Sequence, residues 1–337
     1  MAPSKFFHFF PVPSFLRMPA AGLSVNDEGV RFVHISDIDG AAKVESFGSA
    51  DFPAGAVVNG EIRDEAAVAN AFAALKKQYG LRFVRAAISD DAVYLFRLNL
   101  PLISESDVRS AIEFKLEENV PIPAGDAIFD YSIANRNDVL GTTEAVVAAV
   151  ASKTSESYLD TMKSAGLSPL RLDLESQAIA HAVVPKAERG TVLVAHFAHT
   201  KTLLFLVQGG MVQFSFTLPV EERADPAGAQ SPQKYQKLVL VREGIERIVN
   251  YWKDTMPLPA GESFSFKVIA SGGEALDAEF VSKFASLAGQ PVEVADPWQN
   301  VFDSNDAAPP IPKEDSFRYA AAIGVALANC PRLNFHV

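Results

Sequence analysis

The feature that most constrains this chain is a strand-turn-strand pattern that occurs twice, near the start of each half. Residues 21–35 place a polar turn at 26–29 between two apolar runs, and residues 191–207 repeat this arrangement. A third predicted strand follows each hairpin, at 42–47 and, after a glycine turn, at 211–218. Apolar runs bounded by turn-forming residues are typical of β-hairpins. The sequence therefore predicts two lobes built on one plan, each opening on antiparallel strands.

Helical patterns alternate with further strands along the rest of the chain. Residues 64–79 space their apolar side chains at helical intervals and end at Gly80, and residues 104–120 do the same until a proline-rich stop. Ser104 stands where it would cap the second of these helices. Alternating helices and strands predict an α/β protein. We expect further helices at 154–165, 176–184, 238–253 and 317–328, and further strands at 83–100, 129–133, 145–151, 170–174, 266–273 and 291–295.

Composition excludes several classes of protein. A chain of 337 residues is too long for one compact core. Its net charge of −11, without clustered Lys and Arg, argues against a nucleic-acid surface. Cys330 is the only cysteine, which excludes an intrachain disulfide framework and a cysteine-based zinc site and fits a reducing compartment. No run reaches the roughly 18 apolar residues of a membrane span. We therefore expect a soluble protein, with membrane contact only through a partner or the N-terminal segment.

The N-terminal segment, residues 1–20, carries the largest apolar feature outside the predicted core. Its phenylalanines are interrupted by prolines, so the segment is a poor signal peptide. We expect these phenylalanines to pack against the first lobe, because few cationic residues flank them for a membrane anchor. The four side chains concerned are Phe6, Phe7, Phe9 and Phe10.

Several strings, taken in order, carry a resemblance to a known family. They are VVNGEI at 57–62, the run 98–118 followed by VPIP, AGLSPLRLDLESQAIAHAV at 165–183, VIASGGEAL and PVEVADPWQNV within 268–301, and AAIGVALA at 321–328. Together they make the chain resemble the PilM family of type IV pilus assembly proteins, a branch of the actin-like ATPases, from about residue 19 to residue 328.

The resemblance implies an α/β, two-lobed actin-like (ribonuclease H-like) ATPase fold. It implies a first lobe at 21–186 with an inserted subdomain, and a second lobe with the closing helix at 187–337. The second-lobe cap is expected to be reduced, because residues 219–236 are shorter than the family's usual segment. Gly244 stands where the family usually has a glutamate, whereas Arg247 matches a familiar arginine.

In actin-like ATPases two glycine-rich hairpins hold the phosphates, each with an aspartate near its tip to organise Mg²⁺. Glycine lets backbone N–H groups approach phosphate oxygens, and carboxylates hold the hard cation. In the first hairpin of this chain Ser24 replaces the aspartate and Asn26 replaces the second glycine. Asp27 and Glu28 follow closely, which leaves two readings open: they rescue a metal site, or they form a solvated turn.

The second hairpin departs from the family pattern as well. His196 stands in place of the aspartate and Ala198 in place of the glycine, while Thr202 is retained. Neutral imidazole is a poor ligand for Mg²⁺, which prefers oxygen. The two histidines at 196 and 199 supply at most half of a zinc site, so we expect no metal there. The resemblance also implies an adenosine loop at Ser271, Gly272 and Gly273, although glycines that end a strand are ordinary connections.

PilM-like proteins bind the cytoplasmic N-terminus of the inner-membrane protein PilN in a groove of the first lobe. The resemblance places the wall of that groove at Asn59, Gly60, Glu61 and Ile62. An extended peptide in a groove is held by backbone hydrogen bonds and a few side-chain pockets. The alternative is that Gly60 only turns the chain.

The resemblance, together with these substitutions, implies a cytoplasmic scaffold of type IV pilus assembly with a degenerate nucleotide site. Its expected partners are a PilN-like peptide and other pilus assembly proteins, with no nucleic acid and only indirect contact with the inner membrane. We expect no catalytic residues, and the only candidate cofactor is ATP with Mg²⁺. Two alternatives stay open: an active ATPase whose metal is held by Asp27 or Glu28, and a division or secretion adaptor of the same fold.

Overall fold

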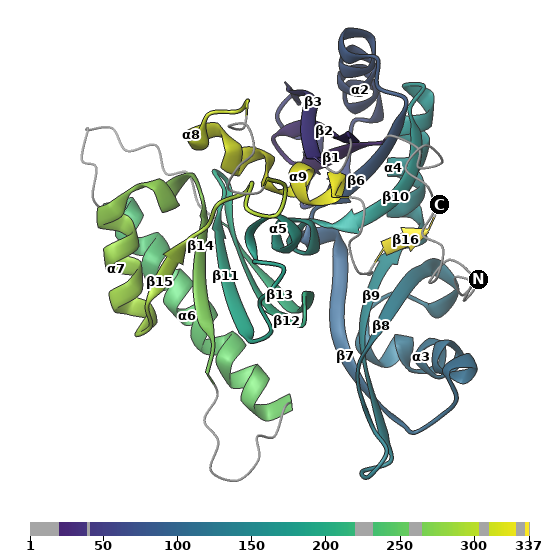
Figure 1. The fold of residues 1–337 in the computed structure, drawn as a ribbon. Coiled ribbons are helices and arrows are strands. Elements are labelled where there is room, and N and C mark those ends of the chain that lie inside the picture. The colour runs from purple at the N-terminus through teal and green to yellow at the C-terminus, as the bar shows by residue number, and fades with distance from the viewer. Residues whose placement is uncertain are drawn as a thin grey trace.

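The computed structural model describes residues 20–38, 41–219, 232–255, 265–302, 310–327 and 334–336. The predictions about the N-terminal phenylalanines and most of the shortened second-lobe segment fall outside these ranges. Figure 1 shows two lobes side by side, with a small subdomain projecting from the first lobe. In the described part of the chain, no helix has both the length and the apolar run that a bilayer crossing demands.

The first lobe is built on a mixed sheet with the strand order β16-β10-β6-β1-β2-β3. The first three strands form an antiparallel meander, and β6 and β10 then run parallel to β1. The short C-terminal strand β16 returns to this sheet beside β10, a pairing that the sequence did not predict. The strands are β1 (Ala21–Asn26), β2 (Gly29–Ile38), β3 (Ala41–Asp51), β6 (Phe83–Ile88), β10 (Ser168–Leu174) and β16 (Asn334–His336).

The second lobe repeats this plan in the order β13-β12-β11-β14-β15. An antiparallel meander again comes first, and two strands parallel to its first strand complete the sheet. The predicted repeat of one plan is therefore present in the strand order. The strands are β11 (Thr191–Phe197), β12 (Lys201–Gln208), β13 (Met211–Pro219), β14 (Lys267–Gly272) and β15 (Val292–Val294).

Helices cover both sheets and fill the space between them (Figure 1). The apolar sides of α2 and α4 pack on the first sheet, and those of α6 and α7 pack on the outer face of the second. Between the two sheets, α5 and α9 share one core with residues of both lobes. These helices are α2 (Glu65–Tyr79), α4 (Ser152–Ser164), α5 (Glu175–Val183), α6 (Pro232–Thr255), α7 (Ala278–Ala288) and α9 (Ala320–Ala326), and the short α8 (Lys313–Ser316) precedes α9.

The inserted subdomain is a three-stranded sheet covered by one helix. Its strands lie in the order β7-β9-β8, and the predicted apolar stripe of α3 is buried against them. Ser104 stands at the N-cap of α3, but its hydroxyl bonds the Asp107 carboxylate at 2.7 Å instead of capping a backbone N–H, so the predicted capping bond is wrong. The elements are β7 (Val93–Pro101), α3 (Glu105–Asn119), β8 (Ala127–Asn137) and β9 (Thr142–Ala151).

Candidate functional site between the lobes

The candidate site lies where the carboxyl ends of the parallel strands of both lobes meet. In the first lobe β1 and β6 end side by side, so the first hairpin tip adjoins the short 3₁₀ turn η2 (Asp90–Ala92). In the second lobe β11 and β14 do the same, so His196 is level with Ser271. Ligands of open α/β sheets bind at such strand ends, where backbone groups and polar side chains gather.

In the first hairpin Asn26 and Glu28 make their contacts within the hairpin itself. Ser24 is buried within β1. The Asn26 side-chain oxygen accepts the backbone N–H groups of Glu28 at 3.1 Å and Gly29 at 3.2 Å, which closes the turn. The Glu28 carboxylate pairs with Arg31 at 3.2 Å. Neither Asn26 nor Glu28 is therefore directed to hold a phosphate or a metal.

Asp27, at the tip of the same hairpin, reaches the predicted partner-binding turn instead. Its two carboxylate oxygens accept the backbone N–H groups of Asn59 at 3.0 Å and Gly60 at 3.1 Å. That turn joins the two-residue strands β4 (Val57–Val58) and β5 (Glu61–Ile62). The structure thus brings a predicted nucleotide residue and the predicted partner residues together, a link that sequence spacing did not indicate.

In the second hairpin His196 is bonded within its own lobe. Its Nδ1 lies 3.1 Å from the Ser271 hydroxyl, and both residues are buried. Burial, and then the positive charges of Lys201 and Lys237, lower the pKa of His196 to about 4, so the imidazole is neutral at physiological pH. Thr202 is also fully buried, and its hydroxyl has no hydrogen-bond partner among the described residues.

The glycines after Ser271 are explained in part by packing. A Cβ on Gly272 would lie 2.1 Å from the Phe197 carbonyl oxygen, and its φ of 98° also favours glycine. Gly273 begins the 3₁₀ turn η4 (Gly273–Leu276), and a Cβ there would meet no atom within 4 Å. Close approach of β11 and β14 therefore accounts for Gly272, whereas nothing in the packing requires Gly273.

Lys201, which no sequence pattern singled out, is one of the residues that reach from one lobe to the other. From the second hairpin its ammonium group donates to the Ser89 hydroxyl at 2.6 Å and lies 2.8 Å from Glu175 and 3.3 Å from Asp91. All three partners belong to the first-lobe side of the site, at η2 and at the start of α5. A lysine beside a turn is ordinarily solvated, so only the two-lobed arrangement reveals these partners.

The charge of this cluster follows from burial and pairing. Burial disfavours the Lys201 ammonium, but the carboxylates of Glu175 and Asp91 outweigh it and raise the pKa of Lys201 above its ordinary value. Burial alone would raise the pKa of Asp91, yet Lys201 and hydrogen bonds lower it. Burial raises the pKa of Asp90, whose Oδ1 accepts the backbone N–H of Ser176 at 2.8 Å. The ammonium therefore stays charged at neutral pH, with the ionised Asp91 carboxylate beside it.

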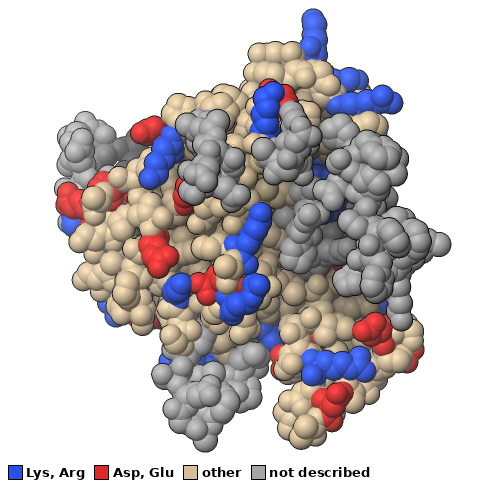
Figure 2. Space-filling view, viewed as in Figure 1, with Lys and Arg blue, Asp and Glu red and all other residues tan. Residues whose placement is uncertain are grey.

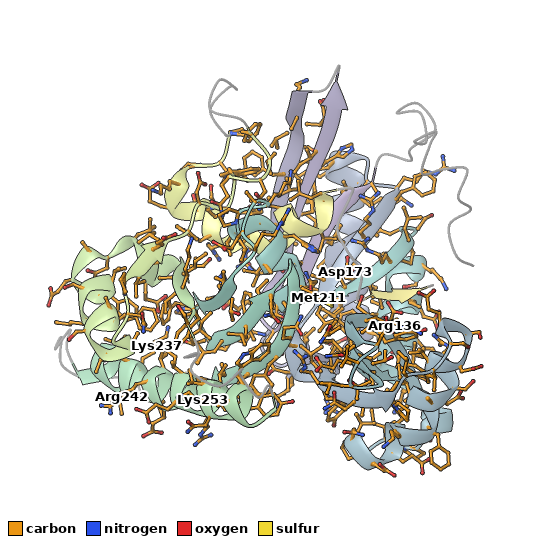
Figure 3. The ribbon with its side chains drawn as sticks, turned by 60° about the horizontal axis from the view of Figure 1, so that its bottom comes forward. Arg136, Asp173, Met211, Lys237, Arg242 and Lys253 are labelled. Carbon is orange, nitrogen blue, oxygen red and sulfur yellow. The ribbon has the colours of Figure 1, made fainter. Side chains whose placement is uncertain are left out.

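A second buried lysine, Lys237, lies on α6 in the second lobe (Figure 3). Its ammonium pairs with Glu274 and donates to the Ala198 carbonyl at 3.3 Å. Arg247, the arginine that matches the family, lies over the Phe216 ring, 5.7 Å from its centroid. Both cationic side chains thus interact with other groups of the protein.

The described residues do not fit a binding site for ATP with Mg²⁺. Magnesium needs oxygen ligands in a near-octahedral arrangement. Here Asp27 accepts backbone N–H groups, Glu28 pairs with Arg31, and an ammonium lies among the remaining carboxylates. Over the described ranges, no group of three or more His, Cys, Asp or Glu residues is arranged to hold a metal ion. On the face drawn in Figure 2, basic and acidic side chains of the described residues are interspersed.

The buried neutral state of His196 predicts a pH effect on stability. The pKa of His196 falls from 6.5 to about 4 on folding, so between these two pH values the unfolded chain binds more protons than the folded one. The free energy of unfolding therefore decreases as the pH falls from about 6.5 to 4. From pH 7 to pH 5 the free energy of unfolding should fall by about 2 kcal/mol more in the wild type than in His196→Asn, a variant that keeps a polar atom near Ser271. Urea unfolding at both pH values measures this difference. Equal losses in the two proteins would contradict the assignment.

Comparisons with known proteins agree with this architecture. A profile of the family described as "Type IV pilus assembly protein PilM" matches residues 22–215. Among solved structures, the PilM-PilN type IV pilus biogenesis complex is similar over 92% of this chain and 98% of that chain, with a TM-score of 0.75 and 19% identity. The cytoplasmic domain of EpsL, an inner membrane component of the type II secretion system of Vibrio cholerae, covers 90% of this chain and 93% of its own, with a TM-score of 0.49 and 14% identity. A search of curated sequences found no match. The predicted two-lobed actin-like fold is confirmed.

Proposed function

Because this chain belongs to the PilM family of type IV pilus assembly proteins, we propose that it is a cytoplasmic scaffold that works without nucleotide turnover. In this proposal it binds the cytoplasmic N-terminal peptide of a PilN-like inner-membrane protein, and so reaches the membrane only through its partner. Contacts with further pilus assembly proteins would connect this complex to the cytoplasmic machinery. The observation that carries the proposal is the family match, which spans both hairpins and the 57–62 turn.

Support for the peptide site comes from the solved relative and from the shape of the turn. The similar structure contains PilM together with PilN. In this chain Asn59 and Glu61 are exposed, and Val58 is exposed as well, so the turn offers both polar and apolar contacts. An extended peptide lying beside such a hairpin gains affinity from backbone hydrogen bonds and specificity from side chains.

Support for a degenerate nucleotide site comes from the lysine between the lobes. An ATP molecule in an actin-like cleft needs a cation to offset its phosphates, and that cation needs carboxylates. Here the carboxylates of Glu175 and Asp91 are neutralised by Lys201 from the opposite lobe. The lobes are thus bridged by a side chain where other members of the fold use a ligand.

One calorimetric experiment tests both parts of the proposal. The purified protein is titrated with a synthetic peptide of the cytoplasmic N-terminus of the PilN-like protein from the same genome, with and without ATP and Mg²⁺, and with ATP and Mg²⁺ alone. We expect peptide binding with an affinity that changes less than about twofold on adding nucleotide, and no binding of ATP alone. Glu61→Ala should weaken the peptide, whereas Glu45→Gln, on the distant β2–β3 hairpin, should not. If the peptide does not bind, the scaffold proposal is wrong. If ATP binds in a magnesium-dependent way, the proposal of a degenerate nucleotide site is wrong.

A further inference from the structure

The carboxylate of Asp27 joins two features that the sequence assigned to different tasks. It stands at the tip of the first hairpin, where the fold would present a phosphate-binding group. Its oxygens nevertheless accept the N–H groups of Asn59 and Gly60, more than thirty residues along the chain. Hydrogen bonds to an ionised acceptor are stronger than those between neutral groups. This hairpin tip is therefore engaged in holding the 57–62 turn.

The turn requires such support because its backbone is unfavourable and its strands are short. Asn59 has a φ of 50° and Gly60 a φ of 72°, so both lie in the left-handed region. That region is uncommon for residues other than glycine. The strands on either side contribute only two residues each, and an isolated short hairpin is marginal in water. Two charge-assisted bonds at the two left-handed residues fix the conformation that the strands alone would leave loose.

Two further contacts support the 57–62 turn. The buried Tyr158 hydroxyl, from α4, donates to the Gly60 carbonyl at 2.8 Å. A Cβ on Gly60 would lie 3.0 Å from the Cβ atoms of Ser89 and Ala92, so the turn rests directly on η2. Ser89 in turn accepts the Lys201 ammonium from the second lobe. The turn is thus supported by the first hairpin, by α4 and, through η2, by the bridge between the lobes.

We infer that Asp27 is a positioning residue for peptide binding: its carboxylate presets the 57–62 turn in the conformation that receives an extended partner peptide. This inference rests on the proposed function. A binding element that is already ordered loses less conformational entropy on association than a loose one. Without the carboxylate, the peptide has to order the turn as it binds, and part of its affinity is spent on that ordering. A carboxylate at the tip of the first hairpin therefore serves the partner site here.

The test compares Asp27→Ala and Asp27→Asn with the wild type and with Glu45→Gln, which removes one negative charge from an exposed ion pair elsewhere. Calorimetry with the PilN-like peptide should show binding about tenfold weaker for Asp27→Ala and an intermediate loss for Asp27→Asn, whose single carbonyl oxygen still accepts one N–H. Hydrogen exchange should show lost protection of the Asn59 and Gly60 amides in Asp27→Ala. The urea midpoint of Asp27→Ala should stay close to that of the wild type, whereas it would fall if Asp27 had only a structural role. Tyr158→Phe, which removes the hydrogen bond to the Gly60 carbonyl, should also lower the affinity for the peptide.

The outcomes separate the inference from the proposed function. If the wild type binds the peptide and Asp27→Ala binds it equally well, or if the two amides exchange as in the wild type, the inference is overturned while the scaffold role stands. If the wild type itself does not bind the peptide, the proposed function fails and the inference falls with it. If Glu45→Gln weakens the peptide as much as Asp27→Asn, the effect is one of net charge, and the positioning role is overturned.

Discussion

Replacing Lys201 with methionine is expected to lower the free energy of unfolding by about 3 kcal/mol. Methionine keeps the length and apolar stem of lysine but removes the ammonium that lies 2.8 Å from Glu175. The Glu175 side chain is only 6% exposed, so its carboxylate would remain buried without its cation. We expect the lower end of the usual cost of an unpaired buried charge, because the Asp91 partner is more exposed and water can reach it. Urea unfolding followed by circular dichroism measures the change.

The matched control for this prediction is Lys77→Met, at an exposed lysine in the last turn of α2. It should change the free energy of unfolding by less than about 0.5 kcal/mol. The double variant Lys201→Met with Glu175→Gln should regain part of the lost stability, since it removes the orphaned charge together with its partner. A Lys201→Met protein as stable as Lys77→Met, or a double variant less stable than the sum of its singles, would contradict an ion pair that holds the lobes.

The bridge at Lys201 is one of several contacts that join the two lobes. Contacts between the lobes occur at several places in the described residues. Lys201 spans the strand ends, and Arg97 of the inserted subdomain donates to Gln213 of β13 at 2.7 Å. Met211, labelled in Figure 3, packs against the core of the first lobe. These contacts come from the chain itself, so side chains of both lobes contribute to their packing against each other.

Local patterns in the sequence were enough to predict much of this fold. Turn residues between apolar runs located both hairpins, and the helix that ends at Gly80 appears with the predicted boundary, its C-cap in the left-handed conformation. The substitutions at Ser24 and His196 were visible from the residues alone. These features depend on interactions within a few residues, which is the range over which propensity and periodicity carry information.

Long-range partners could not be predicted in the same way. Lys201 and Asp91 are 110 residues apart, and Asp27 and Asn59 are 32 apart, so neither pair has a local signature. The pairing of β16 with β10 likewise joins the C-terminal part of the chain, residues 334–336, to residues 171–173 in its middle. Charged residues next to turns are usually solvated, and only the packing of the two lobes removes Lys201 from water. Only the structure therefore reveals the long-range partners of Lys201 and Asp27.

Replacing Gly324 with alanine is expected to destabilise the protein by about 3 kcal/mol or more, although alanine is the better helix former. Gly324 lies in α9, and a Cβ there would stand 1.7 Å from the Ala178 carbonyl oxygen and 2.6 Å from its carbon. Both neighbours are backbone atoms of α5, so no side chain can move aside. The two helices would have to separate and open the core that they share with both sheets. Helix propensity alone predicts a gain of about 1 kcal/mol, so the sign of the change decides between propensity and packing.

Gly125→Ala is the control for this second prediction, because a Cβ at Gly125 meets no atom within 4 Å and its φ is not positive. Urea unfolding should place Gly125→Ala near the wild type and Gly324→Ala far below it, or leave Gly324→Ala without a cooperative transition. A Gly324→Ala protein at least as stable as the wild type would mean that α5 and α9 are not in backbone contact. A Cβ on Gly22 of β1 would likewise stand 2.2 Å from the Ala322 carbonyl oxygen of the same helix. Two glycines therefore permit one close stack of α5, α9 and β1, and this stack holds the first hairpin, with Asp27 at its tip, in place beneath the 57–62 turn.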